Sequence, residues 1–234
     1  MDEFVKENYS LITYSVEFIA VLTGLILLRK YKNTHAKAII FFLIYAFLVD
    51  FIGSYPSILY KNNLFHLIED TLIERNYWWY AIFWWVGLSV FMVLINYKVV
   101  SNDSLKKILK YSLYVYLLQV LLCLIFRFEL IFKPDEQFLK IASFWIVVLS
   151  IVVYLFEILR SEKIVLFYKS LYFYLNIIMF LWILVMIPMD FFEVYFRSDD
   201  WNYIILKYKI YLSLNIFLYL SISAALVFCK PETK

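Results

Sequence analysis

Seven long apolar runs dominate this chain and limit it to one class of fold. They cover residues 10–29, 37–55, 78–97, 108–126, 138–159, 167–189 and 204–228, and short polar connections separate most of them. A helix of about 20 residues is long enough to cross the roughly 30 Å of hydrocarbon in a bilayer. We therefore predict an all-α membrane protein, a bundle of seven transmembrane helices that forms a single domain over residues 1–234.

The composition excludes a soluble globule. Hydrophobic residues make up 65% of the chain and charged residues 18%, whereas a soluble domain has about 45–50% and about 25%. The seven predicted spans use nearly the whole chain, so no room is left for a separate output domain. The Lys and Arg residues are scattered beside the apolar runs rather than gathered on one face, which argues against nucleic acid as a partner.

The basic residues predict how the bundle is oriented in the membrane. The first, third and fifth connections and the carboxyl-terminal tail hold 13 of the 22 Lys and Arg residues. Because basic loops tend to stay in the cytoplasm, we predict that the amino terminus lies outside and the carboxyl terminus in the cytoplasm. The opening residues MDEFVKENYS are rich in acids, unlike a cleavable signal, so the first run is predicted to be a retained span.

The longest connection, residues 56–77, carries apolar residues at helical spacing. Leu64, Leu67, Ile68 and Leu72 predict a short amphipathic helix at the membrane surface. Proline is confined to the predicted span ends and the connections, which argues against a transporter whose helices are broken near the midplane. The four prolines are Pro56, Pro134, Pro188 and Pro231.

Polar side chains recur at helical spacing inside five spans, so each of these spans has a polar stripe on one side. The stripe residues singled out are Gln119, Ser150, Tyr154, Asn176 and Asn215. Such stripes are explained by hydrogen bonds between helices or by a polar path through the bundle. At the inner end of the fifth span, Glu157 and Arg160 are spaced for a local ion pair.

Two acids lie deeper in the apolar runs than a charged group should. Glu17 lies roughly 12 Å below the outer end of its span, and Asp50 roughly 8–10 Å, at a rise of about 1.5 Å per residue. An ionised carboxylate near the bilayer centre costs about 2.5–3.5 kcal/mol. Consecutive antiparallel helices are usually neighbours, so we expect the two carboxylates to approach one another in the outer leaflet.

The surroundings of these acids suggest two interpretations. One is an outward-facing pocket with aromatic walls, and the other is a structural lock between helices, with the Arg127 guanidinium as counter-charge in either case. The predicted pocket residues are Glu17, Asp50, Tyr14, Ser54, Trp84, Trp85, Arg127 and Asp190.

The motifs of common membrane enzymes are missing from the sequence. There is no HExxH and no nucleophile elbow, and His35 and His66 are single loop residues. Cys123 and Cys229 both lie in apolar context and form no CxxC motif. We therefore expect no metal, no cofactor and no enzymatic activity of the common kinds.

The first quarter of the chain resembles a known group of proteins. The segments are Glu17-Phe-Ile-Ala-Val-Leu-Thr-Gly24, Arg29-Lys-Tyr-Lys-Asn33 and Phe42-Leu-Ile-Tyr-Ala-Phe-Leu-Val-Asp-Phe-Ile-Gly53. They look like the start of small, uncharacterised seven-span bacterial inner-membrane proteins. The resemblance implies that Glu17 and Asp50 match acidic positions of that group.

Three functions are compatible with these observations. The first is a sensor or coupling subunit, in which the outer pocket binds a small molecule, lipid or partner helix and the basic loops signal to a separate protein. The second is a transporter or an oligomeric, pore-forming protein. The third is an intramembrane lipid-modifying enzyme, with Glu17 and Asp50 as acid and base. The partners expected are the bilayer, a soluble or membrane protein, and a second copy of the chain.

Overall fold

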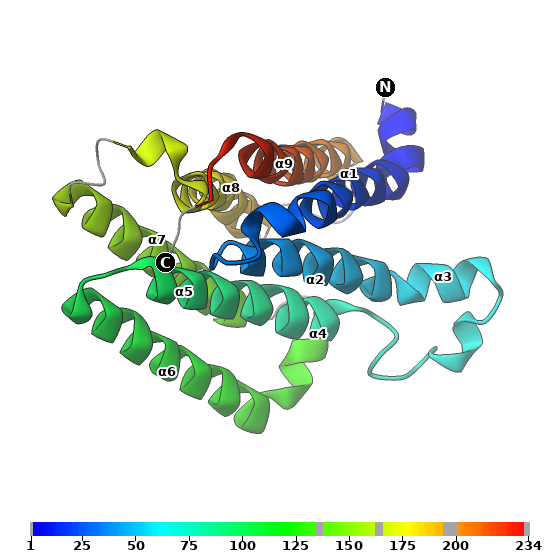
Figure 1. Cartoon of the computed structure of the whole chain (residues 1–234). Coiled ribbons are helices and arrows are strands. Elements are labelled where there is room, and N and C mark those ends of the chain that lie inside the picture. The colour runs from blue at the N-terminus through cyan, green and yellow to red at the C-terminus, as the bar shows by residue number, and fades with distance from the viewer. Residues whose placement is uncertain (1, 134–137, 162–165, 194–200, 232–234) are drawn as a thin grey trace. The chain divides into compact units, whose positions relative to one another are not determined.

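The computed structural model describes residues 2–133, 138–161, 166–193 and 201–231, and the regular structure in these ranges is helical (Figure 1). The π-helical stretch Tyr80–Val86 joins α4 to α5, so that Tyr77–Val99 forms one span. The helices are α1 (Asp2–Tyr31), α2 (Lys37–Gly53), α3 (Tyr55–Lys61), α4 (Tyr77–Trp79), α5 (Gly87–Val99), α6 (Asp103–Phe126), α7 (Phe138–Arg160), α8 (Leu171–Glu193) and α9 (Trp201–Phe228).

These helices confirm an all-α, multi-pass membrane protein. Six are long and apolar enough to cross a bilayer, and a seventh span results if α2 and α3, which meet at a bend of 41°, are taken together. The predicted span boundaries agree with the helices to within a few residues, apart from the amino-terminal extension of α1. Apolar runs mark spans this well because a helix satisfies its own backbone hydrogen bonds in lipid.

The helices belong to two compact units. The first unit comprises Met1–Ile44 and Glu162–Lys234, and so contains α1, the start of α2, α8 and α9. The second unit comprises Tyr45–Ser161, which includes the end of α2 and α3 to α7. The predicted pocket residues are divided between these two units.

In the first unit, α1 packs along α9 and α8 packs against α9. The end of α1 binds the end of α9: Lys30 Nζ donates to the carbonyls of Leu226 (2.9 Å) and Val227 (2.8 Å). The Tyr31 hydroxyl lies 2.9 Å from the Leu226 carbonyl and 3.0 Å from that of Cys229. The last carbonyls of a helix lack intrahelical partners, and a cation there also interacts favourably with the negative end of the helix dipole. Lys30 and Tyr31 therefore cap α9 as well as closing α1.

In the second unit, α5, α6 and α7 pack on one another. Their shared core contains fully buried residues such as Leu88, Met92, Leu109 and Ile151. Burying apolar side chains releases little free energy in lipid, so close packing and hydrogen bonds must hold these helices together. The polar groups of this core are described with the candidate site.

The predicted surface helix over residues 64–72 is wrong. The helix of this connection is α3, which begins directly after α2 with Pro56 in its first turn, where a missing N–H is tolerated. It ends at Lys61, and Asn63 two residues later has a φ of 59°, with Leu64 N–H bonded to Leu59 C=O (2.8 Å). This is a helix-ending motif that favours Gly or Asn. A 3₁₀ turn over Phe65–Leu67 and a second positive φ at Asp70 follow, so no helix forms there.

One proline lies differently from the prediction. Pro188 is inside α8, which continues to Glu193, rather than at the end of that helix. Proline donates no backbone hydrogen bond, so the Leu184 carbonyl, four residues earlier, loses its usual α-helical partner. The apolar span ends at Asp190, within one residue of the predicted end at 189, although the helix itself continues to Glu193.

Candidate functional site

The predicted pocket residues fall into two sets. Tyr14, Glu17 and Asp190 belong to the first unit, whereas Asp50, Ser54, Trp84, Trp85 and Arg127 belong to the second. The approach of Glu17 to Asp50 would join the two units and stays a prediction.

In the first unit, contacts between α1 and α9 show which residues of the two helices lie at the same height along their axes. The Tyr9 and Tyr208 rings meet edge to face with centroids 5.1 Å apart, and Lys30 and Tyr31 bind the end of α9. The paired residues are 195 to 199 positions apart in the sequence. Both helices rise about 1.5 Å per residue, so Glu17 lies level with about residues 212–216 of α9. That turn contains Asn215.

Asp190 lies close to the same level. Its Oδ1 accepts a hydrogen bond of 3.3 Å from the Tyr211 hydroxyl, one turn before Asn215 on α9. Since α1 and α8 both pack against α9, Glu17 and Asp190 come within about one turn of each other along its axis. Asp190 is thus a second carboxyl group of the first unit at about the level of Glu17 along α9.

Glu17 is fully buried, with 0% of its surface exposed, and Thr13 one turn earlier is 7% exposed. The Thr13 hydroxyl makes no hydrogen bond to the residues that the structure describes. Buried polar groups in proteins almost always have a partner, so a hydroxyl of this kind is unusual. Glu17 therefore lies in a buried and polar part of α1, as a functional carboxyl would.

In the second unit, three side chains at the start of α4 bind the end of α2 and the first residue of α3. Trp79 Nε1 donates to the Val49 carbonyl (2.8 Å), and Asn76 Nδ2 donates to the Gly53 carbonyl (2.7 Å). Trp78 Nε1 donates to the Tyr55 hydroxyl (3.2 Å). Indole rings bury a large apolar area while their N–H finds a partner, as they do here. Asp50, which follows Val49 on α2, is half-buried.

The remaining pocket candidates have more ordinary surroundings. The Ser54 hydroxyl donates to the Phe51 carbonyl in the last turn of α2 (2.7 Å). Trp84 is half-buried, and the Trp85 ring packs edge to face on Phe144 with centroids 4.9 Å apart. Arg127 is exposed and its guanidinium lies 5.7 Å from the Phe138 ring centroid, so among the described residues of the second unit it contacts a ring and forms no ion pair.

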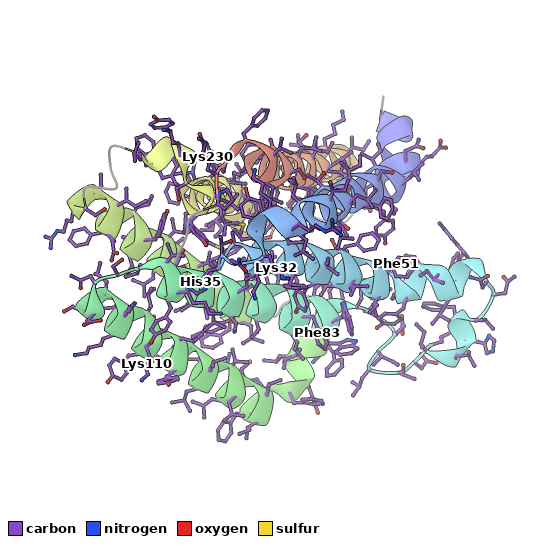
Figure 2. All side chains as sticks on the ribbon, in the orientation of Figure 1. Lys32, His35, Phe51, Phe83, Lys110 and Lys230 are labelled. Atoms are coloured by element: carbon purple, nitrogen blue, oxygen red, sulfur yellow. The ribbon has the colours of Figure 1, made fainter. Side chains whose placement is uncertain are left out.

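The π-helical stretch between α4 and α5 carries an unusual contact. Gly87 N–H bonds the Trp84 carbonyl instead of the Phe83 carbonyl four residues back. The Tyr45 hydroxyl of α2 donates to that Phe83 carbonyl, and Figure 2 labels Phe83 on this stretch. A Cβ at position 87 would collide with the Tyr45 ring and hydroxyl. π-Helical turns are rare and are often found at functional sites.

From this stretch towards the far end of α5, buried polar side chains form successive layers of hydrogen bonds between α5 and α7, called the ladder here. In the first layer, the Ser143 Oγ lies 2.7 Å from the Tyr116 hydroxyl, and Ser89 Oγ is 3.4 Å from the Ser143 carbonyl. In the second layer, Asn96 Nδ2 donates to the Ser150 carbonyl (3.1 Å) and hydroxyl (3.0 Å). Both pairs are 54 residues apart, so the two helices run in register.

Glu157 forms a third layer, and the predicted pair with Arg160 is wrong. The Glu157 carboxylate accepts hydrogen bonds from the backbone N–H groups of Ser101 and Asn102, the latter at 3.2 Å. The Arg160 guanidinium lies over the Phe156 ring, 4.1 Å from its centroid. Glu157 lies seven residues after Ser150, which lies seven after Ser143, so all three share one face of α7. The ladder therefore ends on the connection between α5 and α6.

The polar stripe residues have different environments. Ser150, Tyr154 and Asn176 are buried. Ser150 accepts a hydrogen bond from another helix, whereas Asn176 Nδ2 donates to the Tyr172 carbonyl of its own helix (2.9 Å). Asn215 is half-buried, and Gln119 is exposed on α6. Gln119 is thus the stripe residue that does not face the packed part of its unit.

Sequence reasoning missed Ser89, Asn96 and Thr13. The signal for the first two was their spacing of seven residues, which matches the spacing of Ser143, Ser150 and Glu157 on another span. Two helices that carry polar residues every seven positions can pair them layer by layer. Thr13 gave no comparable signal, because a threonine in a span usually bonds its own helix.

The chain matches no family model, no curated protein and no solved structure, so the geometry of these two units is the evidence on which a function must rest.

Proposed function

We propose that this protein is a multi-pass membrane sensor or coupling subunit. An outward-facing polar and aromatic pocket binds a small molecule, lipid or partner helix, and the protein passes the change to a separate protein on the cytoplasmic side. The receptor-like role, a bacterial inner membrane and an external amino terminus are parts of this proposal. The basic connections and the resemblance of the first quarter of the chain support its location and orientation.

One observation carries the proposal: in the second unit, a π-helical stretch at one end of α5 is linked through buried polar contacts to the connection at the other end of α5. The π-helical stretch Tyr80–Val86 leads directly into α5. α5 is tied to α7 through the two ladder layers, and Glu157 of α7 holds the connection at Ser101 and Asn102. A π-helical turn holds one residue more than an α-helical turn. Its conversion to α-helix would rotate α5 by about 100° relative to α4.

The ladder supports coupling over transport. Ser143, Ser150 and Asn96 are at most 1% exposed, and their side chains bond to one another or to backbone carbonyls. A transport path needs polar groups that face water or cargo. Polar groups that bind each other across two helices instead hold those helices in one of a few discrete packing arrangements. Coupling between two sites requires an element with such discrete states.

The coupling is tested by a change at the outer side of this path and a measurement at the inner side. Tyr45→Phe removes the hydroxyl that bonds the Phe83 carbonyl and leaves the ring in place. We expect amide hydrogen exchange at Ser101 and Asn102 to become severalfold faster, because the altered stretch displaces α5 and weakens the Glu157 contacts. Tyr60→Phe is the matched control, since Tyr60 is 72% exposed on α3. Unchanged exchange in Tyr45→Phe would refute coupling through α5.

The signalling role predicts a partner. We expect the protein, extracted from its native membrane into nanodiscs, to be purified with a second protein in fixed ratio. That protein should bind inside-out vesicles and not right-side-out vesicles, because the basic connections are predicted to face the cytoplasm. A preparation that contains only this chain, or a partner that binds right-side-out vesicles, would contradict the proposal and favour the transporter or pore.

A further inference from the structure

Gln119 carries an amide group inside a membrane span and has no partner among the described residues of its own unit. It is exposed and makes no hydrogen bond to the residues that the structure describes. Lys110 of the same helix is labelled in Figure 2 and marks the amino-terminal half of α6. Gln119 lies seven residues from the end of α6 at Phe126, which places it about 10 Å inside the apolar span. At this depth no water is present to bond a polar group, so the amide requires a partner.

The residues around Gln119 form a seam of the kind that helices use to pair. Their spacing alternates between four and three residues, which is the heptad pattern of two helices that pack along their length. Val115 is 57% exposed, Leu122 44% and Phe126 78%. The seam residues are Ile108, Ser112, Val115, Gln119, Leu122 and Phe126.

We propose that this seam, the α6 seam, is a homodimer interface in which Gln119 of one copy binds Gln119 of a second copy. A primary amide is donor and acceptor at once, so two of them can form a reciprocal pair. A second copy inserted in the same orientation places its Gln119 at the same depth. A two-fold axis along the membrane normal then brings the two residues face to face. The seam contains no charged residue that would call for a partner of opposite charge. This inference does not depend on the proposed function.

An amide residue such as Gln119 in a largely apolar seam fixes the register of the pair. Hydrogen bonds between membrane helices stabilise association by about 1–2 kcal/mol in model peptides, and a tenfold change in affinity corresponds to about 1.4 kcal/mol. We therefore expect Gln119→Leu to raise the dissociation constant of the dimer about five- to thirtyfold in vesicles, measured by energy transfer between labelled copies at increasing dilution. Gln119→Asn keeps the amide and should retain part of the affinity.

Cross-linking tests the geometry. In a background with Cys123→Ala and Cys229→Ala, Val115→Cys should form an intermolecular disulfide under oxidation, since Val115 lies one turn from Gln119 on the seam. Val152→Cys is the matched control, because Val152 is 51% exposed on α7 and is not in the seam. Added Gln119→Leu should reduce the Val115→Cys dimer and leave the fold unchanged by circular dichroism.

Three results would overturn the interface. They are a monomer at every dilution, a dimer with unchanged affinity in Gln119→Leu, and equal cross-linking at positions 115 and 152. Cross-linking of Val115→Cys to a different protein would show that the α6 seam has another occupant.

Discussion

Gly87→Ala is expected to lower the free energy of unfolding by about 2 kcal/mol, measured by denaturant titration in mixed micelles. The backbone of Gly87 is ordinary helix (φ −59°), so the residue is needed for space and not for its conformation. An added Cβ would collide with the Tyr45 ring and hydroxyl. Extra methyl groups in a packed core typically cost about 1–3 kcal/mol, and here the Tyr45–Phe83 hydrogen bond is lost as well.

Two variants identify the cause of this loss. Gly24→Ala is the control and should change the stability little. Its Cβ would lie 3.0 Å from a methyl group of Ile40, a tight contact, but alanine favours the helix by about 1 kcal/mol over glycine and offsets it. Adding Tyr45→Phe to Gly87→Ala removes the colliding oxygen, so the double variant should lose less stability than the sum of the single ones. Strict additivity would show that Tyr45 and Gly87 do not meet.

Glu157→Ala is expected to lower the free energy of unfolding by about 2–3 kcal/mol. The variant leaves the N–H groups of Ser101 and Asn102 without their carboxylate acceptor. Hydrogen bonds to a charged group are each worth about 1.5–3 kcal/mol, and water at the membrane surface replaces part of that. Denaturant titration measures the loss, and hydrogen exchange should show that it begins at residues 100–103.

Two comparison variants show whether the loss depends on the charge of Glu157 and on its place in the fold. Glu157→Gln keeps one acceptor oxygen and should lose about half as much stability. Glu129→Ala removes an exposed glutamate of the same unit and should change stability by less than about 0.5 kcal/mol. If Glu157→Ala were as mild as Glu129→Ala, the carboxylate would not hold the connection between α5 and α6.

The spans were predictable from the sequence, and the connection at residues 56–77 was not. The apolar runs that became α6 and α7 are visible by length alone, because lipid requires a continuous helix. In the connection, Leu64, Leu67, Ile68 and Leu72 have helical spacing, yet Asn63 and Asp70 adopt positive φ and prevent a helix. Spacing records which side chains could share a face, whereas the backbone conformation of Asn and Asp depends on local hydrogen bonds.

The candidate site was predictable only in part. The depth of Glu17 and its cost in lipid singled it out, and the structure buries it completely. The expected ion pair of Glu157 with Arg160 followed from their spacing, but two backbone N–H groups from a distant connection took the carboxylate instead. Arg127 was expected to face the acids, and in its unit it lies over Phe138. Side chains at span ends are long enough to reach several partners, so spacing along one helix does not choose among them.

The sequence by itself determined that this protein is a multi-pass bundle of apolar helices and approximately where each span begins and ends, because these depend on the hydrophobicity of single segments. Only the tertiary structure decided which polar groups meet. Ser89 and Asn96 find Ser143 and Ser150 because α5 and α7 pack in register, and Tyr45 finds the Phe83 carbonyl because Gly87 leaves room. Such contacts join residues far apart in the chain, and their partners depend on the packing of whole helices rather than on the pattern within any one of them.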